Sequence, residues 1–260
     1  FSAFSFLTIN FYAQGISAAS HLPGGHMQLA AWRETGGLIG ICLAAVAPTL
    51  LMLWSASPMV GFTLGFAGCG LLASWMMRHQ WGGAAPRAPS NFAVIWQDHL
   101  ARRLLILAFV NAMPVAVTST LFLFFVTPRL QAGAWAGGLL LVFFLSAAGS
   151  APVWAKAAQR FGTRQSLIWA MSLAVVVFAL AAFLRSGDVA YFALVCIASG
   201  ASIGADLTLL PAAFAQRLSI IAPRGGQGFG LWALMSKLTL AAAAIAVFPI
   251  LDGAGFDATA

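Results

Sequence analysis

Apolar stretches of about twenty residues recur along this chain, and each is long enough to cross the hydrocarbon core of a bilayer as a helix. Inside a bilayer the backbone must satisfy its own hydrogen bonds, so segments of this kind predict α-helices. Only 7% of the 260 residues are charged, against about a quarter in soluble domains. The sequence therefore predicts an all-α polytopic membrane protein. Eight spans are expected, at 1–19, 35–55, 58–77, 103–126, 133–155, 166–184, 189–210 and 229–250.

The loops between these spans alternate in charge. Ten of the thirteen basic residues lie in one set of loops, which predicts that this set is cytoplasmic and that residue 1 starts on the outer side. We therefore interpret the formal net charge of +7 as a topology signal and not as a sign of nucleic-acid binding. The basic set comprises Arg33, Arg78, Arg87, Arg102, Arg103, Lys156, Arg160, Arg164, Arg217 and Arg224, and the opposite loops hold Arg129, Arg185, Asp188, Asp252 and Asp257.

The longest break in the apolar pattern contains two prolines and a Trp-Gly-Gly turn, and it predicts a domain boundary. Three spans precede this break and five follow it. We therefore expect the chain to be a fragment from which earlier spans are missing. The expected parts are an N-terminal helical bundle at 1–77, a central cytoplasmic loop at 78–102 and a C-terminal bundle at 103–260.

Lys237 lies near the middle of an apolar stretch, with about a dozen uncharged residues on either side. A lysine at the centre of a membrane helix costs about 2.5 to 3.5 kcal/mol on insertion scales, so it indicates a functional site. A water-filled pathway, a carboxylate partner or a bound solute would offset that cost. The alternative is a packing lysine that extends along a neighbouring helix toward the headgroups.

Uncharged hydrogen-bonding groups occupy two neighbouring faces of the first span. Asn10 and Gln14 are four residues apart and share a face, and Tyr12 lies on the adjacent one. Such groups suit a sugar-like ligand. They equally suit hydrogen bonds that join membrane helices, and the sequence leaves both interpretations open.

Two later spans carry further polar residues. In the fourth span Asn111 and Thr118 flank Pro114, which bends the helix and is either a gating hinge or a tolerated kink. Asp206 is expected about four residues from the cytoplasmic end of its span. It is a candidate to pair with Lys237 or a loop arginine, or to take part in proton coupling, and the alternative is a helix-end carboxylate that reaches water.

The segment from Gln159 to Gln165 predicts a tight cytoplasmic turn, in which Gly162 takes positive φ while Arg160 and Arg164 bond helix ends or phosphates. Arg33, at the foot of the second span, is a candidate for a gate with the neighbouring Glu34. Ordinary positive-inside anchoring explains these arginines equally well.

No catalytic motif is present: the chain has no nucleophile elbow, Walker loop or zinc-ligand spacing. We therefore expect no cofactor, no metal site and no enzyme activity.

Several of these segments resemble the glycoside-pentoside-hexuronide:cation symporters, the melibiose-permease branch of the major facilitator superfamily. The segments run Asn10-Phe-Tyr-Ala-Gln-Gly-Ile-Ser, Ala31-Trp-Arg-Glu-Thr-Gly-Gly-Leu, Asn111-Ala-Met-Pro and Gly228-Phe-Gly-Leu-Trp-Ala-Leu-Met-Ser-Lys237. By order and spacing they resemble helices four to eleven of a twelve-helix fold, of which eight would be present. The turn at Arg160-Phe-Gly-Thr-Arg164 is similar to a loop signature of the superfamily.

The resemblance implies that a sugar binds between two bundles and that a cation is coupled through acidic residues and a lysine, which Lys237 matches. The acid of the fourth helix does not carry over, because its place falls near Thr8. The coupling ion is therefore left open between H+ and Na+, and simple facilitation also stays open.

The expected function is secondary active transport of a sugar or sugar-like solute by alternating access, as a cation symporter. Asn10, Tyr12 and Gln14 would face Asn111, Thr118, Trp232 and Lys237 across the site, with Lys237 and Asp206 in coupling. Alternatives are transport of a non-sugar solute and an intramembrane lipid-modifying enzyme, which would need a cluster of His, Asp or Glu. We expect a monomer in the cell membrane, with a bacterial inner membrane favoured, whose partners are lipid and a small solute and not nucleic acid.

Overall fold

The computed structural model describes residues 2–19, 22–53, 57–79, 92–222 and 227–253, and over these ranges the chain is helical without strands. A π-helical turn, η1, and a 3-10 turn, η2, connect α5 to α6. The elements are α1 (Ser2–Ala19), α2 (Gly25–Met52), α3 (Pro58–Met77), α4 (Phe92–Gln97), α5 (His99–Phe124), η1 (Phe125–Arg129), η2 (Gly133–Trp135), α6 (Ala136–Phe161), α7 (Thr163–Ala181), α8 (Val189–Ile221) and α9 (Gln227–Gly253).

Seven helices within the described ranges are long and apolar enough to cross a membrane. They are α2, α3 and α5 to α9, which confirms an all-α polytopic membrane protein. The first predicted span, at 1–19, forms α1, but α1 is not among the seven. Its polar residues, including Asn10 and Gln14, lower its hydropathy.

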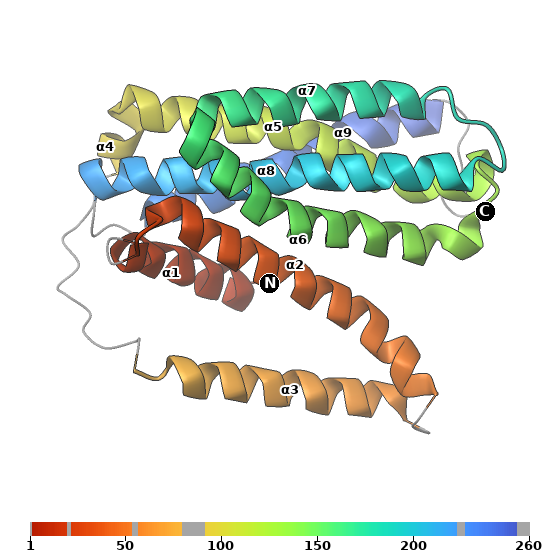
Figure 1. The fold of residues 1–260 in the computed structure, drawn as a ribbon, viewed down its shortest axis with the longest axis horizontal. Coiled ribbons are helices and arrows are strands. Elements are labelled where there is room, and N and C mark those ends of the chain that lie inside the picture. Colours follow the sequence, from red (N-terminus) through yellow and green to blue (C-terminus); the bar gives the residue numbers. More distant parts are fainter. Residues whose placement is uncertain (1, 20–21, 54–56, 80–91, 223–226, 254–260) are drawn as a thin grey trace.

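Successive long helices run in opposite directions, so their connections gather at two opposite ends of the molecule (Figure 1). We name the end with α4 and the α6–α7 turn the basic end, because it holds the loops of the basic set. Much of the predicted central loop, including Arg87, lies outside the described residues, as do Arg224 and Asp257.

Two helix boundaries differ from the sequence prediction by ten residues or more. Helix α2 begins at Gly25 and not at residue 35, and α8 continues to Ile221 and not to 210. Both extensions carry charged residues, which ended the apolar windows, but in the structure Arg33 pairs with Glu34 and Arg217 with Asp98. At 33 residues α8 is about 50 Å long, longer than the hydrocarbon core of about 30 Å.

The centre of the fold is a close contact between α6 and α8. A Cβ added to Gly200 would collide with the Phe143 carbonyl, and one added to Gly204 would collide with Ser150 and the Ala147 carbonyl. These glycines therefore let the two backbones approach closely, as small residues do at membrane helix contacts. Two side-chain hydrogen bonds reinforce the contact: Ser146 donates to the Ile197 carbonyl (2.6 Å) and Trp154 to the Ala201 carbonyl (2.7 Å). A third bond joins α8 to α7, since Ser202 donates to the Ala170 carbonyl (2.6 Å).

Helix α2 packs across α6 and α8, although the central loop separates them in sequence. Thr35 donates to the Ala148 carbonyl (3.2 Å), and Leu38 is buried beside Ala147 and Ala148. Helix α3 contacts α2 and is set apart from the other helices (Figure 1), and none of its residues is buried. The fold thus places α1 and α2 against the helices that follow the central loop.

Candidate functional site

Lys237 connects the last long helix to the first. Its Nζ donates a hydrogen bond to the Ser5 hydroxyl oxygen at 2.8 Å, which joins α9 to α1. The ammonium is thus held at the contact between helices from the two sides of the central loop. The Lys237 side chain is exposed in this structure.

Asp206 lies near the middle of α8 and not near its end, because α8 is longer than predicted. Its carboxyl group is hydrogen-bonded to Asn111 of α5. Its Oδ1 is buried and has no hydrogen-bond partner among the described residues. Two ion pairs are found within the described ranges, Arg33–Glu34 and Arg217–Asp98, and neither involves Asp206. The candidate pairing of Asp206 with Lys237 or a loop arginine is therefore not among the ion pairs of the described residues.

A third contact relates the depths of these two groups. Thr239 of α9 donates to the Phe109 carbonyl of α5 at 3.3 Å. Helices α5 and α9 run in the same direction, and Lys237 precedes Thr239 by two residues while Asn111 follows Phe109 by two. Lys237 and Asn111 therefore lie about four residues, or about 6 Å, apart along the bundle. We call Ser5, Asn111, Asp206 and Lys237 the polar layer.

Arg33 lies within α2 and faces α1, whereas the sequence placed it at the foot of a span. Its guanidinium carbon is 3.5 Å from the centre of the Tyr12 ring, and its Nε donates to Glu34 Oε1 at 2.9 Å. The Tyr12 hydroxyl donates to the same oxygen at 2.9 Å. Arg33 Nη2 is buried without a hydrogen-bond partner in the described part of the chain. A buried charged donor without an acceptor is costly, so this nitrogen marks a place where a ligand acceptor would be favourable.

Between the polar layer and the basic end lies an aromatic layer of four rings. Tyr12 contacts Phe229 with ring centres 5.1 Å apart, Phe229 contacts Phe214 at 5.8 Å, and Phe214 contacts Trp232 at 5.2 Å. Eight residues separate Lys237 from Phe229, which is about 12 Å along α9. The same separation holds between Asp206 and Phe214 on α8. Four aromatic side chains therefore lie between the polar layer and the basic end.

The whole chain, residues 1–260, matches the family described as MFS/sugar transport protein. The chain belongs to this family. It is a major facilitator transporter that crosses the membrane several times. Comparison with curated proteins and with solved structures gave no match.

In this transporter, other predicted site residues form contacts within their own helices. Asn10 Nδ2 donates to the Phe6 carbonyl at 2.8 Å, and Thr118 donates to the Pro114 carbonyl at 2.8 Å. Gln14 is exposed. Trp232 is half-buried and packs in the aromatic layer. The structure brings Tyr12, Asn111, Trp232, Lys237 and Asp206 around the two layers.

The predicted turn motif lies at the basic end of the transporter, away from the polar layer. Gly162 has φ 88°, as predicted, and its amide donates to the Ala158 carbonyl to end α6. The Arg160 guanidinium lies 5.4 Å from the Phe161 ring centre, and Arg164 is exposed. Arg160, Gly162 and Arg164 therefore belong to the turn between α6 and α7, and these contacts do not reach the polar layer.

A groove of about 560 Å³ opens between the first turns of α2 and the last turns of α6. Gln28, Trp32, Thr35, Lys156 and Gln159 contribute to its lining. None of the predicted substrate-binding residues lines it, so this groove and the polar layer are separate features of the transporter. No group of three or more His, Cys, Asp or Glu that could hold a metal occurs among the residues the structure describes.

Sequence reasoning missed two parts of this arrangement. It did not select Ser5, although Ser5 and Tyr12 share a face of α1 at a spacing of two helical turns. It also assigned Arg33 to a gate with Glu34 and overlooked that both reach Tyr12 on α1. Glu34 follows Arg33 directly in the sequence, and in the structure its carboxylate accepts hydrogen bonds from both Arg33 and Tyr12. That adjacent carboxylate was the signal available in the sequence for this contact.

Proposed function

We propose that this transporter moves a sugar or sugar-like solute by alternating access, as a symporter coupled to H+ or Na+. The observation that carries the proposal is the polar layer. It combines Ser5 of α1 with residues of α5, α8 and α9, and four aromatic side chains lie between it and the basic end. The family match supports transport of a solute of the sugar class.

The division of the chain supports the same proposal. In our proposal residues 1–77 belong to the N-terminal bundle, 78–102 form the central loop, and 103–260 belong to the C-terminal bundle. The Lys237–Ser5 and Thr35–Ala148 hydrogen bonds cross between these bundles. Alternating access requires contacts between bundles that break and re-form, and a site at mid-depth between them.

The polar groups have distinct roles in this mechanism. Asn111, Lys237 and the free Nη2 of Arg33 donate hydrogen bonds to solute hydroxyl or carboxylate oxygens, and Asn10, Gln14 and Thr118 complete the polar lining. Tyr12 and Trp232 offer ring faces to the apolar face of a sugar. Asp206, with one oxygen unpartnered, is the group that would accept a proton or contact Na+, in concert with Lys237.

Topology and partners follow from the charge distribution. The basic end, which includes Arg160, Gly162 and Arg164, faces the cytoplasm in our proposal. The protein acts as a monomer in a bacterial inner membrane, without a cofactor. An intramembrane enzyme is disfavoured because it would need several clustered acid or base groups at membrane depth.

The test is uptake of a panel of radiolabelled sugars into vesicles that contain the complete protein, with Na+ and pH gradients imposed separately. Accumulation that follows one gradient, and that is lost in Lys237→Ala, is the expected result and names the coupling ion. No accumulation of any sugar under either gradient would contradict the proposal. A parallel panel of non-sugar solutes would then identify the alternative substrate class.

A further inference from the structure

The short helix α4 inserts a fully buried side chain into the basic end of the bundle. Ile95 has an exposed fraction of 0% and belongs to a cluster with residues of α1, α5, α8 and α9. Helix α4 itself contacts α5, α8 and α9. We call this set the basic-end cluster: Ile16, Ile95, Ala101, Leu105, Phe214, Ala215, Leu218, Ala222 and Phe229.

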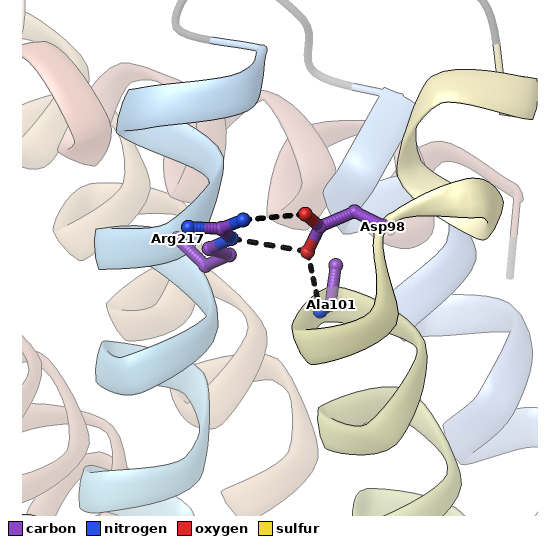
Figure 2. A network of polar contacts seen from close by, with 3 residues as sticks. All are labelled: Asp98, Ala101 and Arg217. Carbon is purple, nitrogen blue, oxygen red and sulfur yellow. Dashed lines mark hydrogen bonds and ion pairs between the residues drawn. The ribbon is translucent and has the colours of Figure 1, made fainter.

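An ion pair fixes the corner where α4 meets α5. Arg217 of α8 binds both carboxylate oxygens of Asp98, with Nε 3.0 Å from Oδ1 and Nη2 2.5 Å from Oδ2 (Figure 2). Asp98 Oδ1 also accepts a hydrogen bond from the Ala101 amide at 2.8 Å, which caps the first turn of α5. One carboxylate therefore anchors α4 to α8 and starts α5.

The pairing is strong in form because it is bidentate and charge-assisted. The Arg217 side chain beside Asp98, together with the Ala101 amide, lowers the pKa of Asp98 to about 2. The carboxylate is therefore ionised at neutral pH. Helix α4 has only six residues, and a helix that short is not stable without tertiary contacts. Its position thus depends on the buried Ile95 and on the ion pair.

We propose that α4 is a closing strap at the basic end, in which Asp98–Arg217 is the clasp and Ile95 completes the apolar surface onto which α1 docks. The inference rests on the proposed function, because it assumes that the basic end opens during transport. Opening must withdraw Ile16 and Tyr12 of α1 from Phe229 of α9. While the Asp98–Arg217 ion pair is intact, Ile95 stays in the apolar surface. Helix α1 then closes onto that surface without a change in the position of α4.

The test measures exposure of the basic-end cluster directly. Ala215 of the cluster is replaced by cysteine in the complete protein, with Cys42, Cys69 and Cys196 replaced by alanine, and the protein is placed in lipid nanodiscs. The rate of reaction with a hydrophilic maleimide reports how often the cluster is open. We expect Asp98→Asn to raise this rate several-fold, because asparagine keeps the cap on α5 but removes the charge. Arg217→Gln and Ile95→Ala should raise it similarly.

The matched control is Arg103→Gln, which removes an exposed charge from the same end of α5. An unchanged labelling rate in Asp98→Asn would overturn the inference, and so would an equal rise in Arg103→Gln. Gel filtration and thermal unfolding of each variant distinguish local opening of the cluster from misfolding of the protein. Ile95→Ala tests the apolar contact by itself, because it leaves the Asp98–Arg217 ion pair in place. Solute uptake is measured separately: a wild-type protein that takes up no solute rejects the proposed function, while the labelling rates still decide on the strap.

Discussion

The ammonium of Lys237 lies 2.8 Å from the hydroxyl oxygen of Ser5, and these residues are 232 positions apart. The bond joins α9 to α1, the last and the first helices of the described chain. Any rearrangement that separates α1 from α9 must break the bond or replace it with another acceptor, and a solute hydroxyl is such an acceptor.

Replacing Lys237 with alanine should abolish concentrative uptake while the protein still reaches the membrane, because the charged donor of the polar layer is lost. Ser236→Ala is the matched control, since the Ser236 hydroxyl bonds the Trp232 carbonyl within its own helix. Vesicle uptake under an imposed gradient measures the effect. Uptake at the wild-type level in Lys237→Ala would remove this residue from the mechanism.

Replacing Asp206 with asparagine should abolish accumulation against a gradient but leave exchange of solute across the membrane. Asparagine keeps the shape and the contact with Asn111 but cannot take up a proton. The matched control is Asp188→Asn. Asp188 lies at the start of the same helix, and its carboxylate accepts a hydrogen bond from the Arg185 amide. If accumulation persists in Asp206→Asn, coupling does not depend on this carboxylate.

Replacing Arg33 with lysine should raise the KM for the solute by about tenfold, the factor that one hydrogen bond to a charged group contributes. Lysine keeps the positive charge but loses the planar group that stacks on Tyr12 and binds Glu34. Arg185→Lys, at an exposed position on the opposite end, should leave KM unchanged. A wild-type KM in Arg33→Lys would show that Nη2 does not meet the solute.

Replacing Gly204 with alanine should destabilise the protein by about 1 to 3 kcal/mol, because the added methyl group collides with the backbone of α6. Gly149→Ala on α6 meets no atom within 4 Å. That change should stabilise the helix by up to about 1 kcal/mol. Thermal unfolding in detergent compares the two variants. Equal shifts in Tm would show that α6 and α8 are not closely packed at Gly204.

The clasp should be insensitive to pH in the physiological range. The pKa of Asp98 is lowered from its ordinary 3.8 to about 2, so its contribution to stability is fully present above the ordinary value and is lost as the pH falls through about 2. Maleimide labelling at Ala215→Cys, corrected for thiolate content, should therefore show no effect of Asp98 titration from about pH 8 to about pH 5. A step in that interval that disappears in Asp98→Asn would contradict the assignment.

Much of the fold could be predicted from apolar length alone. The helices at 58–77 and in the second half of the chain follow directly from segments that must bury their backbone polar groups. The start of α2 and the end of α8 could not be predicted in this way. A charged residue interrupts an apolar stretch of sequence whether or not it has a partner in the fold. Arg217 lies inside α8 since Asp98, 119 positions away, neutralises it, and that contact appears only in three dimensions.

The candidate site shows the same limit. Lys237 and Asp206 stand out in sequence because isolated charges in apolar segments are rare. Their contacts with Ser5 and Asn111 could not be recognised from the sequence. Serine and asparagine are ordinary residues of membrane helices, and only the structure shows which residues they contact. In the sequence, Asp206 is a candidate to pair with Lys237 or a loop arginine, or alternatively a helix-end carboxylate that reaches water. The structure instead hydrogen-bonds it to Asn111 and leaves its Oδ1 without a partner among the described residues.

The length of α8 has a mechanical consequence. One unbroken helix carries Asp206 near its middle and Arg217 in its last turns, and close contacts with α6 hold it between these points and its start. Pro211 lies between Asp206 and Arg217 and removes one backbone hydrogen bond, so the last turns of α8 can bend relative to the part that packs on α6. A tilt of those turns would move Arg217 sideways and strain a bidentate ion pair that tolerates little misalignment.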